Sequence, residues 1–380
     1  MAIKVLIVED SPIARSILKR MLDSAPNIEV VGMAETGIQG LELLNKLQPD
    51  VICTDLHMPR MNGLEFTMEV MATKPRPILV ISASVQEEDT ENVFELLDAG
   101  AVDIFPKPRV GGTTEYEAVK HQLINKIQVL SGVRVFTRRR RSDPGAVPSH
   151  EVSPSPSPPS LPTASRIPPP RSLHPPTLPV IQTPPPSRRY SLPTKPKVLA
   201  VGASTGGPQA LRTVLSPLPN DFPAPVLCVQ HISEGFLQGL LDWLGHQCHL
   251  PIRIAEQGET PRAGVIYFPR EQFHLELDAL GRFHYSNGMR VGGHRPSVTV
   301  TFQAVARVYR GATVGVLLTG MGRDGADGML AIHQAGGYTI AQNEQSCVVF
   351  GMPKEAIALG AAREVLPIEV IPLTLMKVFV

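Results

Sequence analysis

Residues 198–207 read VLAVGASTGG, an apolar run that passes directly into a glycine-rich turn. The run Val198–Val201 is short and carries no charge, which predicts a buried strand. A helical pattern begins near Gly207, so the stretch predicts a strand, a sharp turn and a helix. Ser204 lies at the centre of the turn in a G-x-S-x-G pattern. Units of this kind build parallel sheets that are covered by helices on both faces.

The same alternation of apolar runs and helical patterns extends through both ends of the chain. Further strands are predicted at Ile3–Val8, Val51–Thr54, Ile78–Ile81, Val226–Val229, Val265–Phe268, Val314–Leu318 and Tyr338–Ala341. Helical patterns cover Ala14–Leu22 and Gly40–Leu47 and begin near Phe236, Ser297 and Ala326. The predicted fold class is therefore α/β, with two doubly wound parallel-sheet domains, the first flavodoxin-like and the second Rossmann-like.

A proline-rich segment separates these two parts. The chain has 38 prolines, and 18 of them lie between Pro144 and Pro196. The segment has too few large apolar residues to offset the entropy of ordering, so residues 138–196 are predicted to form a tether of polyproline II character. The run Arg138–Arg141 opens it, either as solvated charge or as a contact for an acidic surface. The predicted divisions are 1–130, a linker over 131–196, and 197–380.

Composition excludes several classes of protein. Thirty-six basic and 35 acidic residues leave a net charge of +1, which gives no field for nucleic acid or an anionic membrane. No apolar run is long enough for direct membrane insertion, and no signal peptide is visible. Four scattered cysteines do not make a disulfide framework: Cys53, Cys228, Cys248 and Cys347. We expect a soluble, reduced, cytoplasmic protein that is a monomer.

Three polar residues follow predicted strands of the C-terminal part: Ser204, His231 and Asp324. Because the carboxyl ends of parallel strands meet in one crevice, we expect these side chains to lie together. A serine hydroxyl needs a base, and an imidazole held by a carboxylate supplies one. Each residue alone has a simpler explanation, since such a turn can bind phosphate and Asp324 or Asp327 can cap a helix. Together they predict a serine hydrolase.

A second group of polar residues follows the strands of the N-terminal part: Glu9, Asp10, Asp55, Ser82 and Lys107. A single acid at a strand end is ordinarily solvated or caps a helix. Three carboxylates in one crevice would repel one another unless a hard cation such as Mg²⁺ lies among them. With a lysine to neutralise phosphoryl oxygens, a carboxylate can then accept a phosphoryl group, and Ser82 can bind that group and move its loop.

Residues 1–130 resemble a response-regulator receiver domain. The resemblance rests on Glu9-Asp10, Asp55 with Met58-Pro59 and Asn62-Gly63, Ser82-Ala83 and Lys107-Pro108. It implies that a histidine kinase phosphorylates Asp55, and that Glu9, Asp10, Asp55 and the His57 carbonyl surround Mg²⁺. Ile104 and Pro106 depart from the usual receiver pattern, at a position often held by an aromatic residue and at one usually held by a small residue.

Residues 197–380 are similar to the catalytic domain of the chemotaxis protein-glutamate methylesterases. The matching stretches are GASTGG, the QH at 230–231, HRPSV at 294–298, LLTGMGRDGA at 317–326 and IAQNEQSCVVFGMP at 340–353. The similarity implies that Ser204 is the nucleophile, His231 the general base and Asp324 the orienting carboxylate. It places Thr205 and Met321 near the oxyanion and Arg295 on the substrate-facing rim.

The implied activity is hydrolysis of glutamate γ-methyl esters on the cytoplasmic domains of methyl-accepting chemoreceptors, with release of methanol, together with deamidation of receptor glutamines. The hydrolase reaction needs no cofactor. We expect the receiver to cover the Ser204 crevice until Asp55 is phosphorylated. One rival is a receiver fused to a non-catalytic binding module. A DNA-binding response regulator is disfavoured, because the C-terminal half lacks a helix-turn-helix pattern and a basic face.

Overall fold

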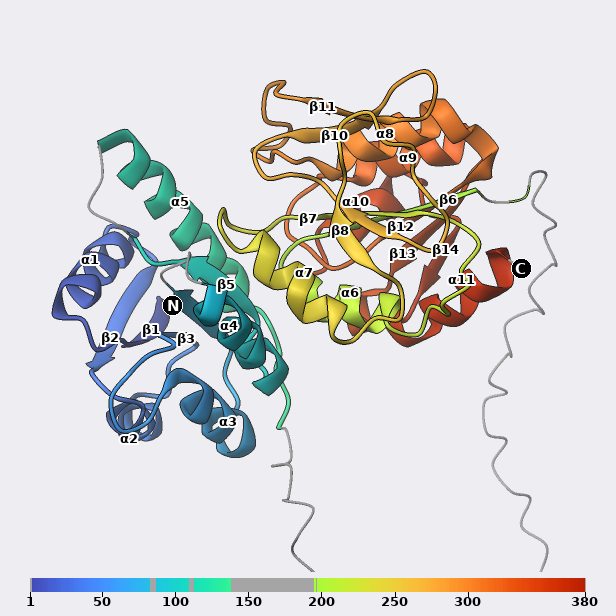
Figure 1. Ribbon diagram of the computed structural model, residues 1–380. Coiled ribbons are helices and arrows are strands. Elements are labelled where there is room, and N and C mark those ends of the chain that lie inside the picture. The colour runs from blue at the N-terminus through green and yellow to red at the C-terminus, as the bar shows by residue number, and fades with distance from the viewer. Residues whose placement is uncertain (1, 83–86, 109–112, 138–194, 196, 380) are drawn as a thin grey trace, which may run out of the picture. The chain divides into compact units, whose positions relative to one another are not determined.

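The computed structural model describes residues 2–82, 87–108, 113–137, 195 and 197–379. The predicted linker, residues 131–196, therefore lies outside the described residues except for 131–137 and 195, and so does the run Arg138–Arg141. Two parallel sheets with their covering helices make up most of the described part of the chain (Figure 1). This confirms the predicted α/β class.

The N-terminal sheet has five parallel strands in the order β2-β1-β3-β4-β5. Its strands are β1 (Ile3–Val8), β2 (Ile28–Ala34), β3 (Val51–Thr54), β4 (Ile78–Ser82) and β5 (Asp103–Pro106). Its helices are α1 (Pro12–Asp23), α2 (Gly37–Leu47), α3 (Gly63–Thr73), α4 (Glu87–Ala99) and α5 (Thr113–Leu130). Strand order reverses between β1 and β3, so a crevice is expected at their carboxyl ends.

Both faces of this sheet are apolar because helices cover both. Along β1, Val5 and Ile7 face α1 and α5, whereas Leu6 and Val8 face α2 and α3, as Figure 1 shows for the helices. A strand that is buried on both faces has a nearly continuous apolar sequence. For this reason IKVLIV could be predicted as a strand of the correct length.

The C-terminal sheet has seven parallel strands in the order β14-β13-β12-β6-β7-β9-β8. Its strands are β6 (Val198–Ala203), β7 (Val226–Gln230), β8 (Ile252–Ile254), β9 (Ile266–Phe268), β12 (Thr313–Leu317), β13 (Tyr338–Gln342) and β14 (Glu364–Leu366). Strand order reverses at β6, which lies between β7 and β12. The carboxyl ends of these three strands therefore share one crevice.

Six longer helices cover the faces of this sheet. They are α6 (Gly207–Leu215), α7 (Leu237–Gly245), α8 (Val298–Tyr309), α9 (Ala326–Gln334), α10 (Met352–Ala358) and α11 (Ile371–Phe379). Core contacts place α6, α7 and α11 on one face and α8, α9 and α10 on the other. Three short 3₁₀ turns complete the described helical segments: Arg310–Ala312, Glu344–Ser346 and Ile368–Val370.

An antiparallel pair was not predicted from the sequence. Strands β10 (His274–Leu277) and β11 (Phe283–Ser286) form a hairpin that packs against α8, where Thr301 Oγ1 donates to the Leu275 carbonyl at 2.8 Å. The hairpin leads into the segment that precedes α8. Among the described helices, none has both the length and the apolar composition that a bilayer span requires.

Candidate functional site

The crevice at the carboxyl ends of β6, β7 and β12 receives the three predicted residues. Ser204 directly follows β6, His231 directly follows β7, and Asp324 lies in the loop between β12 and α9. Ser204 and Asp324 are buried, with 8% and 7% of their surfaces exposed. The structure therefore places all three residues at one edge of the sheet, where their positions after the strands predicted them to lie.

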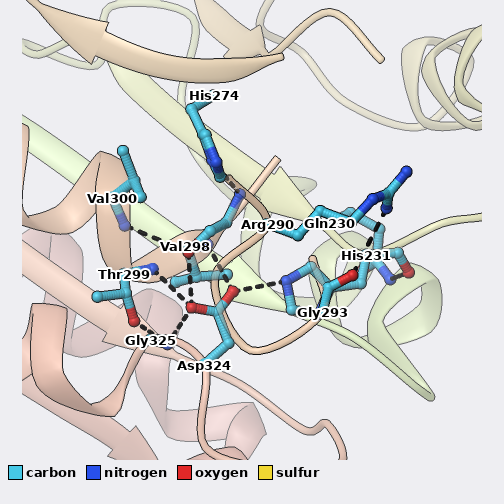
Figure 2. A network of polar contacts seen from close by, with 11 residues as sticks. Gln230, His231, His274, Arg290, Gly293, Val298, Thr299, Val300, Asp324 and Gly325 are labelled. Carbon is cyan, nitrogen blue, oxygen red and sulfur yellow. Dashed lines mark hydrogen bonds and ion pairs between the residues drawn. The ribbon is translucent and has the colours of Figure 1, made fainter. Parts of the chain in front are cut away.

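His231 and Asp324 form a close pair. His231 Nε2 lies 2.8 Å from Asp324 Oδ2 (Figure 2). An ionised carboxylate only accepts hydrogen bonds, so Nε2 carries the proton and Nδ1 keeps its lone pair. His231 Nδ1 is buried and has no hydrogen-bond partner among the described residues. It is the nitrogen that can accept a proton.

The Asp324 carboxylate is held at the N-terminus of α8. Its Oδ1 accepts from Ser297 Oγ at 2.8 Å and from Thr299 N at 3.0 Å, and its Oδ2 accepts from Val298 N at 2.8 Å (Figure 2). Burial by itself raises the pKa of Asp324, but hydrogen bonds from His231 and Thr299 and the charge of His231 outweigh it, and the pKa lies below its usual range. The free N–H groups of a helix start favour the anion in the same way.

This arrangement corrects one alternative from the sequence. Asp324 does not cap the helix that follows it, because Gly325, with φ +90°, takes the N-cap position of α9. Asp324 instead binds the start of α8, and its own neighbour Gly325 donates a further N–H to Oδ1 at 2.9 Å. The carboxylate is therefore fixed from several directions.

The turn after β6 fixes Ser204. Its N–H donates to the Thr319 carbonyl at 3.0 Å, and its carbonyl accepts from Gly207 N at 2.7 Å and from the Gln230 amide at 2.8 Å. Gly206 has φ +74°, and a Cβ at Gly320 would lie 2.7 Å from Ser204 Cβ. Glycine is thus required at both positions for the serine to sit where it does.

Ser204 and His231 line the same cleft, but no hydrogen bond joins Ser204 Oγ to the imidazole in the described structure. Such contacts are often long without substrate and tighten when it binds. Thr205 and Met321 also line this cleft, and within the described residues neither backbone N–H has an acceptor. Two donors are therefore free beside the serine.

Arg295 lines the cleft but does not present its whole guanidinium to it. Its Nη1 donates to the carbonyls of Asn287 and Gly288 at 2.9 and 3.1 Å. The Arg295 guanidinium therefore holds together the loop that carries it. Arg290 lines the same cleft and reaches Gln272 Oε1 at 2.9 Å.

The polar residues of the N-terminal sheet also converge. Lys107 Nζ lies 2.9 Å from Glu9 Oε1 and 2.9 Å from Asp55 Oδ2. Carboxylate oxygens of Glu9, Asp10 and Asp55 all lie within 4.8 Å of one another. Burial, aided by mutual repulsion, raises the pKa of Glu9, and burial likewise raises that of Asp55 despite the nearby lysine.

Ser82 and His57 are the two other residues that the sequence predicted for this pocket. Ser82 is buried at the end of β4, and its carbonyl accepts from Lys107 N at 2.7 Å. His57 is exposed and follows Asp55 by two residues. Glu9 Oε2 is buried without a partner among the described residues. An orphaned carboxylate oxygen among three acids fits a hard cation that takes oxygen ligands.

The sequence did not reveal several supporting contacts. Ser297, Gln230 and His274 all hold parts of the crevice that Ser204 and His231 line, and His294 stacks on the imidazole of His231. The only signal for Gln230, His294 and Ser297 was that 230–231 and 294–298 belong to the stretches on which the resemblance rests, and His274 had no such signal. Nothing in the local pattern indicates which side chain each one contacts.

Comparison with known proteins agrees with both halves of this description. Residues 199–375 match the family described as CheB methylesterase, and residues 5–112 match the response regulator receiver domain. A protein-glutamate methylesterase/protein-glutamine glutaminase of Nitrosospira multiformis is 38% identical over 367 residues, which cover 97% of this chain and 94% of that protein. One of Syntrophus aciditrophicus is 38% identical over 375 residues, covering 99% and 98%. The crystal structure of the Thermotoga maritima CheB methylesterase catalytic domain superposes with a TM-score of 0.47 at 38% identity, over 48% of this chain and 99% of that one.

Fold, site and family matches together define the class as an enzyme in which a response-regulator receiver is joined to an α/β esterase domain. Relatives at this identity span nearly the whole chain on both sides of the comparison. The chain belongs to the protein-glutamate methylesterase/protein-glutamine glutaminase family.

Proposed function

We propose that this protein hydrolyses glutamate γ-methyl esters on the cytoplasmic domains of methyl-accepting chemoreceptors, and deamidates glutamines there, for adaptation in chemotaxis. The observation that carries the proposal is the His231–Asp324 pair, which leaves a buried, unpartnered Nδ1 in the cleft that Ser204 lines. Its family membership supports the same chemistry.

In the proposed acylation step, Ser204 Oγ attacks the ester carbonyl carbon while His231 Nδ1 takes the hydroxyl proton. The free N–H groups of Thr205 and Met321 are the proposed donors to the oxyanion. Collapse of the tetrahedral intermediate breaks the C–O bond, and His231 returns the proton to give methanol. With a glutamine substrate the C–N bond breaks and ammonia leaves.

Deacylation repeats the same steps with water. His231 Nδ1 takes a proton from the water, hydroxide attacks the acyl carbon, and the returning proton restores Ser204. The receptor keeps a free glutamate carboxylate. Asp324 stays ionised throughout and stabilises the imidazolium form of His231, because five donors including His231 surround its two oxygens.

For the receiver, we propose that Asp55 accepts a phosphoryl group from a histidine kinase. Glu9, Asp10, Asp55 and the His57 carbonyl are the residues that would hold Mg²⁺, which when bound neutralises phosphoryl charge. Lys107 offers a second positive charge to the same oxygens, and the hydroxyl of Ser82 is the proposed hydrogen-bond donor to the new group.

The proposed domain division is a receiver over 1–130, a linker over 131–196 and a catalytic domain over 197–380. We propose that the unphosphorylated receiver restricts access to Ser204 and that phosphorylation of Asp55 releases it. A 100-fold activation corresponds to about 2.7 kcal/mol of differential stability between the two states. The proposed form is a cytoplasmic monomer that acts without nucleic acid and without membrane insertion.

The direct test is methanol release from membranes that carry methylated chemoreceptors. Ser204→Ala should abolish release, whereas Ser216→Ala, the same change just beyond the other end of α6, should not. A serine-reactive probe should label Ser204, and His231→Ala should prevent labelling. Labelling that survives this change would favour a non-catalytic binding module in place of a hydrolase.

A further inference from the structure

The imidazole of His231 has a second aromatic ring against its face. The ring centroids of His231 and His294 lie 3.6 Å apart with an angle of 2° between the ring planes. Neutral aromatic pairs ordinarily prefer offset or edge-to-face arrangements with centroids about 4.5–7 Å apart, because two ring faces carry the same partial charge. This close, parallel stack is therefore unfavourable for two neutral rings.

The stacking interaction becomes favourable when one of the two rings is a cation. A cation is attracted to the face of a neutral aromatic ring, and the attraction is stronger in a desolvated site. Burial, followed by the charge of nearby His231, lowers the pKa of His294 to about 4. At neutral pH His294 is therefore the uncharged ring. The stack gains strength only when His231 holds a proton on both nitrogens.

The segment that carries His294 is fastened at several points. His294 and Val291 exchange two backbone hydrogen bonds of 3.0 and 3.1 Å around Gly292 and Gly293, both in the left-handed region. Arg295 binds the carbonyls of residues 287 and 288. The backbone that carries the His294 ring is thus held in place by its loop.

A buried histidine of β10 ties this loop to the catalytic acid. His274 Nε2 donates to the Met289 carbonyl at 3.0 Å, and its Nδ1 accepts from Ser297 N at 3.2 Å. Ser297 Oγ in turn donates to Asp324. One short segment therefore supplies both the ring on the face of His231 and a hydrogen bond to the acid at its edge.

We propose that His294 is a positioning residue that holds the plane of the His231 imidazole and stabilises its imidazolium form in the transition state. The inference rests on the proposed function, because it assigns His231 as the base. No proton passes through His294. An interaction that is stronger in the transition state than in the ground state raises kcat and leaves substrate binding unchanged.

The test compares variants of the full chain by methanol release from methylated receptor membranes. His294→Phe keeps an aromatic face without basic nitrogens, and His294→Leu fills the space without that face. We expect Phe to retain kcat within about threefold and Leu to lose about five- to thirtyfold, which corresponds to about 1–2 kcal/mol. KM should change by less than about twofold in both.

A matched control is His284→Leu, at an exposed histidine on β11, which should leave both constants unchanged. The proposal is overturned if Leu equals wild type, if KM rises while kcat holds, or if Phe falls as far as Leu. The last result would assign the role to a ring nitrogen. Because Phe and Leu both fill the space of the histidine ring, the comparison does not depend on a variant with a cavity in the loop remaining folded.

The same assay separates this inference from the proposed function. If wild-type protein releases methanol and Ser204→Ala does not, the hydrolase assignment stands and the His294 variants test only the stack. If wild type and Ser204→Ala behave alike, the proposed function fails first.

Discussion

Removal of the Ser297 hydroxyl should destabilise the catalytic domain more than it impairs the chemistry. Ser297→Ala deletes the 2.8 Å hydrogen bond to Asp324 Oδ1 and the 3.3 Å cap on Val300 N at the start of α8. A hydrogen bond to a charged group contributes about 1.5–3 kcal/mol and an N-cap about 0.5–2 kcal/mol. Asp324 Oδ1 keeps Thr299 N and Gly325 N, so the two losses are not simply additive.

We therefore expect a loss of about 1–3 kcal/mol in the free energy of unfolding. A domain of this size melts about 2–4 °C lower for each kcal/mol, so the melting temperature should fall by about 2–12 °C. Since Asp324 still has four donors, kcat should fall by less than about tenfold. Calorimetry and methanol release on the same preparation measure the two effects.

Two matched variants sharpen this test. Ser297→Thr keeps a hydroxyl at the helix start and should recover most of the stability. Ser286→Ala removes a serine–carboxylate hydrogen bond of the same 2.8 Å length, to Glu276 in the outer hairpin, and should cost little because that contact is more exposed. If Ser297→Ala melts no lower than Ser286→Ala, the reasoning about the Asp324 cradle is wrong.

Three further predictions follow from the described contacts. Gln230→Leu removes the amide that binds the Ser204 and His231 carbonyls and leaves the latter without a donor, so denaturant titration should show a loss of about 1–3 kcal/mol, whereas an unchanged midpoint would refute the role. The pKa of Asp324 is depressed in the folded state, so its ionised carboxylate stabilises the fold above the unfolded pKa of about 3.9, and this stabilisation is lost as pH falls below that value. The difference in unfolding free energy between wild type and Asp324→Asn should therefore be full at pH 7 and shrink below about pH 4. A difference that grows in acid would contradict this. Chelation of divalent cations should prevent phosphate incorporation at Asp55 from a small phosphodonor but leave basal methanol release by the unphosphorylated protein intact, and loss of both would place a metal in the hydrolase reaction.

The sequence predicted the sheets well because their strands are buried on both faces. Ile3–Val8 and Val51–Thr54 were predicted with the bounds that the structure gives. Ser204, His231 and Asp324 were predicted to follow strands, and the structure places all three at one edge of the sheet. Strand β2 was missed, since its sequence IEVVGMA mixes polar and small residues with partial burial. Local pattern identifies an element only where burial is uniform.

The supporting contacts could not be predicted because they depend on long-range placement. Asp324 meets Ser297 across 27 residues of chain, which include α8 and β12. The hairpin of β10 and β11, which supplies His274 to the same segment, was not revealed by local alternation. Arg295 was expected on the substrate rim, and it lines the cleft; the sequence did not indicate that its Nη1 also binds two loop carbonyls. A cationic side chain near a site can serve either purpose, and only the fold decides which.

The orientation of the His231 ring has a consequence for inhibitor chemistry. Asp324 occupies Nε2, so the ring nitrogen that has no hydrogen-bond partner among the described residues is Nδ1, the one adjacent to the side-chain attachment point. An electrophile anchored on Ser204 must therefore reach closer to the main chain than a reagent designed for a histidine that offers Nε2. Alkylation of this ring is therefore expected at Nδ1 and not at Nε2.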